Sequence, residues 1–125
     1  MSRRVLVLDD DLNVLHLLRT YFAGLGWQVE ACADAPEALR LASSDAPFDA
    51  VICDLHFTAA HLAEGYEILA SARRRRPHSA VLLFTGAAGV GVREEAIRRG
   101  ADEVITKPAP LARLRDAALR AMKSP

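Results

Sequence analysis

The sequence has only two cysteines, Cys32 and Cys53, and no second cysteine or histidine lies at metal-ligand spacing from either. Cysteines this sparse exclude the disulfide framework of small secreted domains, and they exclude a zinc site built on paired cysteines. We therefore interpret both as small hydrophobic residues of the core.

Long apolar runs and an excess of either charge are also missing. No stretch approaches the roughly 20 apolar residues of a membrane-spanning helix, and the first residues lack the features of a secretory signal. Sixteen basic residues balance sixteen acidic ones, so no broad basic face for nucleic acid is expected. We therefore expect a cytoplasmic protein that binds neither membranes nor nucleic acid directly.

Short apolar runs alternate with helix-like segments along the whole chain. Its 125 residues, 51% of them hydrophobic, suit one domain with a substantial core. The alternation predicts an α/β fold with a parallel sheet and helices on both faces. The expected strands are 5–8, 27–32, 50–53, 80–84 and 103–106. The first expected helix carries Leu15, Leu18, Phe22 and Leu25 and is interrupted at Gly24 and Gly26. The second starts at Asp34 and includes Leu41, and the others are 65–76, 92–99 and 111–121.

Polar residues follow several of these strands at the point where each strand ends. In such sheets, ligand chemistry gathers at the carboxyl ends of the strands. Clustered carboxylates repel one another unless a cation lies between them, and Mg²⁺ suits one or two carboxylates together with phosphate oxygens. A carboxylate beside such an ion can attack phosphorus, and a lysine and a threonine can stabilise the transferred group. The residues in question are Asp9, Asp10, Asp11, Asp54, Thr85 and Lys107.

Four segments, in this order and spacing, resemble the receiver domain of response regulators. They are Val7-Leu8-Asp9-Asp10-Asp11, Asp54 after a hydrophobic strand, Thr85-Gly86 and Thr106-Lys107-Pro108. The resemblance covers the chain from about Arg4 to Met122. It implies a single doubly wound (βα)5 flavodoxin-like domain with sheet order 2-1-3-4-5. We expect residues 1–125 to form this one receiver domain, with no effector domain in the chain.

The resemblance also implies a role for each site residue. Asp54 would be the phosphoacceptor, and Thr85 and Lys107 would hold phosphoryl oxygens. The peptide bond before Pro108 is cis in similar proteins. The implied Mg²⁺ ligands are Asp9, Asp10, Asp54 and the backbone carbonyl of His56.

The function that follows from the resemblance is regulatory, and the chain is not expected to be an enzyme. Mg²⁺-dependent transfer of a phosphoryl group to Asp54, from a sensor histidine kinase or a histidine phosphotransfer protein, would change the binding of an unknown output protein. The domain would assist its own phosphorylation and dephosphorylation. A homodimer through the fourth helix, fifth strand and fifth helix is compatible with the resemblance.

Two alternatives stay open from the residues. The chain could be a receiver module of a longer regulator or hybrid kinase. A weaker alternative is an aspartyl-phosphate hydrolase of the haloacid dehalogenase kind, which needs an aspartate two residues after the nucleophile, where this chain has His56.

Some local features also have two readings or depart from the family pattern. Asp11 is interpreted as a helix N-cap in preference to a ligand. The run Arg73–Arg76 is interpreted as a solvated helix end in preference to a docking patch. The loop after Asp54 is expected to be longer than in receivers, and Val104 stands where they commonly carry an aromatic residue.

Overall fold

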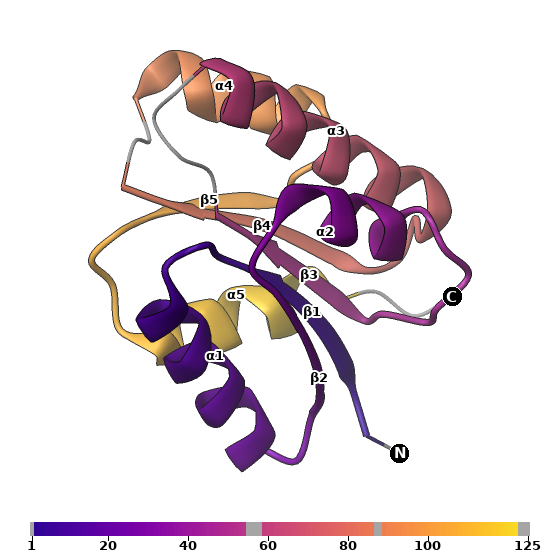
Figure 1. The fold of residues 1–125 in the computed structure, drawn as a ribbon, viewed down its shortest axis with the longest axis vertical. Helices are drawn as coiled ribbons and strands as arrows, with labels where there is room; N and C mark the ends of the chain where they lie inside the picture. Colours follow the sequence, from indigo (N-terminus) through magenta and orange to yellow (C-terminus); the bar gives the residue numbers. More distant parts are fainter. Residues whose placement is uncertain (1, 55–58, 87–88, 123–125) are drawn as a thin grey trace.

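The computed structural model describes residues 2–54, 59–86 and 89–122, and for residues 59–62 it describes the backbone alone. Strands and helices alternate strictly along these residues (Figure 1). The strands are β1 (Arg4–Leu8), β2 (Gln28–Cys32), β3 (Ala50–Cys53), β4 (Ala80–Thr85) and β5 (Glu103–Thr106). The helices are α1 (Leu12–Gly24), α2 (Ala35–Ala42), α3 (Ala59–Arg75), α4 (Val90–Arg98) and α5 (Leu111–Ala121).

The five strands form one parallel sheet in the order β2-β1-β3-β4-β5, which confirms the fold expected from the sequence. Helices α1 and α5 cover one face of the sheet, and α2, α3 and α4 cover the other (Figure 1). Leu8 is in register with Cys32 on one side and with Cys53 on the other. The residues that follow β1 and β3 therefore emerge next to each other.

The residues of strand β1 do not alternate between polar and apolar, and their packing explains why. Val5 and Val7 pack with α1 and α5, whereas Leu6 and Leu8 pack with α2 and α3, and all four are buried. Side chains alternate between the two faces of a strand, so a strand covered on both faces is apolar throughout. Each such burial contributes roughly 1.5–3 kcal/mol of transfer free energy.

Both cysteines are free and buried, as expected. Burial, with nearby carboxylates, raises the pKa of Cys32 to about 11. Burial also raises the pKa of Cys53 strongly. Neither thiol is a nucleophile near neutral pH, because the reactive species is the thiolate.

Two helix starts confirm the sequence analysis and one corrects it. The Asp11 carboxylate caps α1, accepting hydrogen bonds from the backbone N–H groups of Asn13 and Val14 at 3.0 and 3.3 Å. Asp34 caps α2 through the N–H of Glu37 at 2.9 Å. The expectation that the third helix starts at residue 65 was wrong, because α3 starts at Ala59. Alanine, leucine and glutamate in that segment favour helix.

Other element boundaries differ by one or two residues. Helix α4 starts at Val90, two residues before its expected start, and β2 starts at Gln28. Trp27 precedes β2 and packs on Phe22, with ring centroids 4.9 Å apart. Within the described part of the chain, no helix combines the length and apolar character that crossing a membrane requires.

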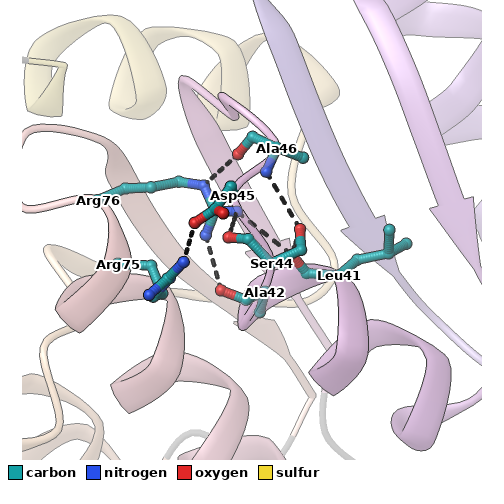
Figure 2. A network of polar contacts seen from close by, with 7 residues as sticks. All are labelled: Leu41, Ala42, Ser44, Asp45, Ala46, Arg75 and Arg76. Atoms are coloured by element: carbon teal, nitrogen blue, oxygen red, sulfur yellow. Dashed lines mark hydrogen bonds and ion pairs between the residues drawn. The ribbon is translucent and has the colours of Figure 1, made fainter.

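The arginine run at the end of α3 is not simply a solvated helix end, and that expectation was wrong for Arg76. The Arg76 guanidinium reaches the end of α2 and lies 5.0 Å from the centre of the Phe48 ring. It is half-buried there. Figure 2 shows the network that joins α3 to the end of α2. Arg76 donates, at 2.7 to 3.3 Å, to the carbonyl oxygens of Leu41, Ala42, Ser44 and Ala46.

Arg73 is also half-buried, and the same expectation was wrong for it. Its guanidinium donates to the carboxylate of Asp102 at 2.5 Å and to the Gly100 carbonyl at 3.0 Å. Gly100 has a φ of +115°, and a Cβ atom there would lie 2.7 Å from the Cβ of Arg73. The position therefore requires glycine. Arg73 thus ties α3 to the connection between α4 and β5.

Candidate functional site

The carboxyl ends of β1 and β3 place Asp9 and Asp54 side by side. The Asp54 backbone N–H donates to the Leu8 carbonyl at 2.9 Å, and the Asp9 N–H donates to the Cys32 carbonyl at 3.1 Å. Asp9 is completely buried, and Asp54 is 9% exposed. Backbone hydrogen bonds to the sheet therefore hold the main chain of both residues in place.

Asp10 completes a group of three carboxylates. One oxygen from each of Asp9, Asp10 and Asp54 lies within 4.8 Å of the other two. Asp10 is exposed, whereas the other two are buried, so the group opens to solvent on one side. Asp11 is not part of this group, because its carboxylate caps α1.

Lys107 reaches the same group from the end of β5. Its Nζ lies 2.8 Å from Oδ2 of Asp9 and 3.2 Å from Oδ1 of Asp54. Its backbone N–H donates to the Thr85 carbonyl at 2.9 Å, and the peptide bond to Pro108 is cis, as the resemblance implied.

Phe84 and Thr85 end β4, the strand next to the one that Lys107 follows. Thr85 is buried at the end of β4, in register with Thr106. Lys107 Nζ lies 5.0 Å from the centre of the Phe84 ring, a cation–π contact that the sequence analysis missed. Because Phe84 lies in an apolar strand, its neighbours in the sequence do not indicate this contact.

The close carboxylates make negative charge predominate in the site. Burial, and then the charge of Asp9, raise the pKa of Asp54 to about 6, although Lys107 acts in the opposite direction. Burial alone would lower the pKa of Lys107, but the hydrogen bond to Asp9 and the charges of both carboxylates outweigh it and raise that pKa. Lys107 is thus held in its charged form and only partly offsets the carboxylates.

The donor set fits a hard divalent cation. Three clustered carboxylates, one of them open to solvent, are the oxygen ligands that Mg²⁺ or Ca²⁺ prefer, and Mg²⁺ keeps several waters in such sites. The raised pKa of Asp54 shows that further positive charge beside it would be stabilising. His56, the fourth ligand expected from the resemblance, lies outside the described residues.

A cavity of about 260 Å³ lies beside the carboxylates, and the sequence analysis did not find it. Asp10 and Asp54 line it together with Asp34 and Glu64, which come from the start of α2 and from α3. Asp34 and Glu64 come together only because α2 packs against α3, so their spacing in the sequence does not predict that they line one cavity.

Comparison with protein families gives a match over nearly the whole chain. The family model for the response regulator receiver domain matches residues 5–119. Response regulator MprA of Mycolicibacterium vanbaalenii is 34% identical over 114 residues, which are 91% of this chain and 48% of that protein. Transcriptional regulatory protein PrrA of Mycobacterium tuberculosis is 32% identical, over 90% of this chain and 47% of its own length. The chain thus spans about half the length of these relatives.

Solved structures give the same result. A CheY-like response regulator receiver domain protein from Methanospirillum hungatei superposes with a TM-score of 0.82 at 25% identity, covering 97% of each chain. A response regulator from Burkholderia pseudomallei, solved with a phosphorylated aspartic acid, a calcium ion and citrate, superposes with a TM-score of 0.81 at 26% identity. That match covers 98% of this chain and 68% of the other.

Proposed function

Because this chain belongs to the response regulator receiver domain family, we propose that it is a signalling switch whose phosphoacceptor is Asp54. The observation that carries the proposal is the position of Asp54. Its nearly buried carboxylate lies within 4.8 Å of the Asp9 and Asp10 carboxylates and 3.2 Å from the ammonium group of Lys107. A carboxylate held in this way can act as a nucleophile towards phosphorus.

In the proposed reaction, one Asp54 oxygen attacks the phosphorus of a phosphorylated histidine. The P–O bond forms and the P–N bond breaks, and the imidazole nitrogen keeps the electron pair that bound it to phosphorus. Lys107 would hold a phosphoryl oxygen, a role supported by the distance of 3.2 Å between its Nζ and Asp54 Oδ1. Buried Thr85 is proposed as a second donor to the phosphoryl group. These donors lower the barrier by stabilising charge on the transferring group.

The residues that would hold Mg²⁺ are Asp9, Asp10, Asp54 and the backbone carbonyl of His56. When bound, the ion would neutralise phosphoryl and carboxylate charge. Asp9 would also keep its ion pair with Lys107, so it would orient the lysine as well as the metal.

MprA is named a response regulator, which supports a sensor histidine kinase or a histidine phosphotransfer protein as the donor. A homodimer through α4, β5 and α5 belongs to the same proposal. So do a cytoplasmic location and a single receiver domain over residues 1–125. The family match favours this function over the haloacid dehalogenase alternative.

Intact-mass spectrometry after incubation with a small acyl phosphate tests the proposal. We expect one phosphoryl group in the presence of Mg²⁺, loss of that group in hydroxylamine, and no addition to Asp54→Asn. Asp11→Asn is the matched control, because Asp11 is a helix cap outside the carboxylate group and asparagine caps equally well. Equal labelling of Asp54→Asn would overturn the assignment.

A further inference from the structure

The cavity beside Asp54 is continuous with the carboxylate group, because Asp10 and Asp54 line both. Its other polar side chains are Asp34 and Glu64. Apart from these four, the described residues that line it are apolar or glycine: Leu8, Ala33, Ala35, Pro36, Gly65 and Ile68.

The charged side chains described around the cavity are all negative. Four of its lining residues are carboxylates, and no lysine, arginine or histidine lines it among the described residues. Neither Asp34 nor Glu64 forms an ion pair with any residue that the structure describes. Both lie outside the group that would hold a divalent ion, so this part of the cavity lining stays negatively charged when the ion is bound.

The size and walls of the cavity restrict what could fill it. Its volume of about 260 Å³ is below the roughly 300–1,000 Å³ of sites for drug-sized ligands. It is several times the volume of about 30 Å³ that one water occupies in the liquid. A bare metal ion would leave the apolar wall in contact with water. An alkyl chain that ends in a cation would cover that wall and place its charge among the carboxylates.

We propose that this cavity binds an arginine or lysine side chain of the phosphodonor protein. The inference rests on the proposed function, since a donor that delivers a phosphoryl group to Asp54 must cover this end of the sheet. The alkyl stem lies against Leu8, Pro36 and Ile68, and the cationic head lies between Asp34 and Glu64. Arginine fits best, because its planar guanidinium can bond both carboxylates.

The first test uses n-butylguanidinium as the probe and its neutral isostere n-butylurea as the control. Both are titrated into the ¹⁵N-labelled protein with Mg²⁺ at saturation. We expect saturable shifts of the amide signals of Ala33, Ala35 and Gly65, with the cation binding about three- to fivefold more tightly than the urea. Absence of saturable shifts, or equal affinity of the two compounds, would overturn the proposal. Shifts that are seen in a second titration without Mg²⁺, but not at saturating Mg²⁺, would also overturn it, because the organic cation would then only be replacing the metal.

Two variants separate charge from shape. Glu64→Gln keeps the shape of the rim and removes one charge, and we expect it to weaken n-butylguanidinium binding about threefold without affecting n-butylurea. Ala33→Leu adds bulk at an exposed position of the wall and should weaken both compounds. Unchanged binding in both variants would place the probe elsewhere on the protein.

A transfer assay tests the source of the side chain. Phosphohistidine peptides with one arginine near the histidine, at each of several positions, are compared with the same peptides carrying neutral citrulline. We expect faster transfer to Asp54 for arginine at one position or more, and an effect lost in Glu64→Gln. Equal rates at every position would contradict the proposal. Labelling of the wild-type protein by a small acyl phosphate is measured alongside, so failure of the cavity proposal is distinguishable from failure of Asp54 as acceptor.

Discussion

The Lys107 ammonium nitrogen lies 2.8 Å from Oδ2 of Asp9, a residue 98 positions away in the chain. Two strands, β3 and β4, separate β1 from β5, so the lysine side chain crosses the end of the sheet to make this contact. Asp9 is completely buried, and removing one partner of a buried ion pair leaves an uncompensated charge. The lysine therefore stabilises the site as well as providing a donor for it.

We expect Lys107→Met to destabilise the metal-free protein by roughly 2–3 kcal/mol at pH 7, because the Asp9 and Asp54 carboxylates then repel each other without a cation. Urea unfolding measures the change. Saturating Mg²⁺ should restore part of the lost stability. A variant as stable as the wild type without Mg²⁺ would show that the lysine does not offset the buried charge.

Stability should also depend on pH through Asp54. Its pKa in the folded protein is about 6, above its ordinary value of 3.8. The folded state therefore binds more protons between these values, and the stability contributed by this group falls as pH rises through that interval. The loss is on the order of 3 kcal/mol.

Urea unfolding between pH 4 and 7 without Mg²⁺ checks this dependence. The fall should be present in the wild type and largely absent in Asp54→Asn, which should be the more stable protein at pH 7. Parallel curves for the two proteins would mean that folding does not raise the pKa of Asp54.

Metal binding should distinguish two neighbouring aspartates. Asp10→Ala should lose Mg²⁺ binding and stay folded, because its exposed carboxylate is one of the three that converge. Asp11→Ala should keep Mg²⁺ binding but lose roughly 1 kcal/mol of stability with the cap of α1. Amide shifts during Mg²⁺ titration measure the first effect, and urea unfolding measures the second. The same shifts in Asp10→Ala as in the wild type would exclude Asp10 as a ligand.

Much of the site could be predicted from the sequence, because its residues directly follow the strands. Asp9 and Asp54 end two apolar runs, and parallel strands bring such ends to one edge of the sheet. Asp11 could be assigned as a cap because cap geometry is local. The strand order and the cis peptide bond before Pro108 came from the family resemblance.

Contacts between distant segments could not be predicted. The Arg76 side chain bonds carbonyl groups 30 to 35 positions earlier, and nothing in its own segment indicates where α2 ends. The cavity wall likewise depends on how α2 packs on α3. The start of α3 was placed six residues too late, at Gly65, although residues 59–64 favour helix.

The network in Figure 2 gives a stability prediction with a neighbouring control. Arg76→Ala should destabilise the protein by roughly 2–3 kcal/mol, because it removes hydrogen bonds to four carbonyl groups and the contact with Phe48. Arg74→Ala should cost less than about 0.5 kcal/mol, since Arg74 is exposed and bonds only the Ser71 hydroxyl among the described residues. Urea unfolding compares the two, and equal effects would mean that the network adds little.

The central claim is that Asp54 alone carries the phosphoryl group, and borohydride trapping tests it most directly. Borohydride reduces an aspartyl phosphate to homoserine, which marks the modified residue for peptide mass spectrometry. After treatment with a small acyl phosphate and Mg²⁺, homoserine should be found at position 54 and at no other aspartate, and it should be absent when Mg²⁺ is chelated. Homoserine at Asp9, Asp10 or Asp11, or none at position 54, would contradict the account.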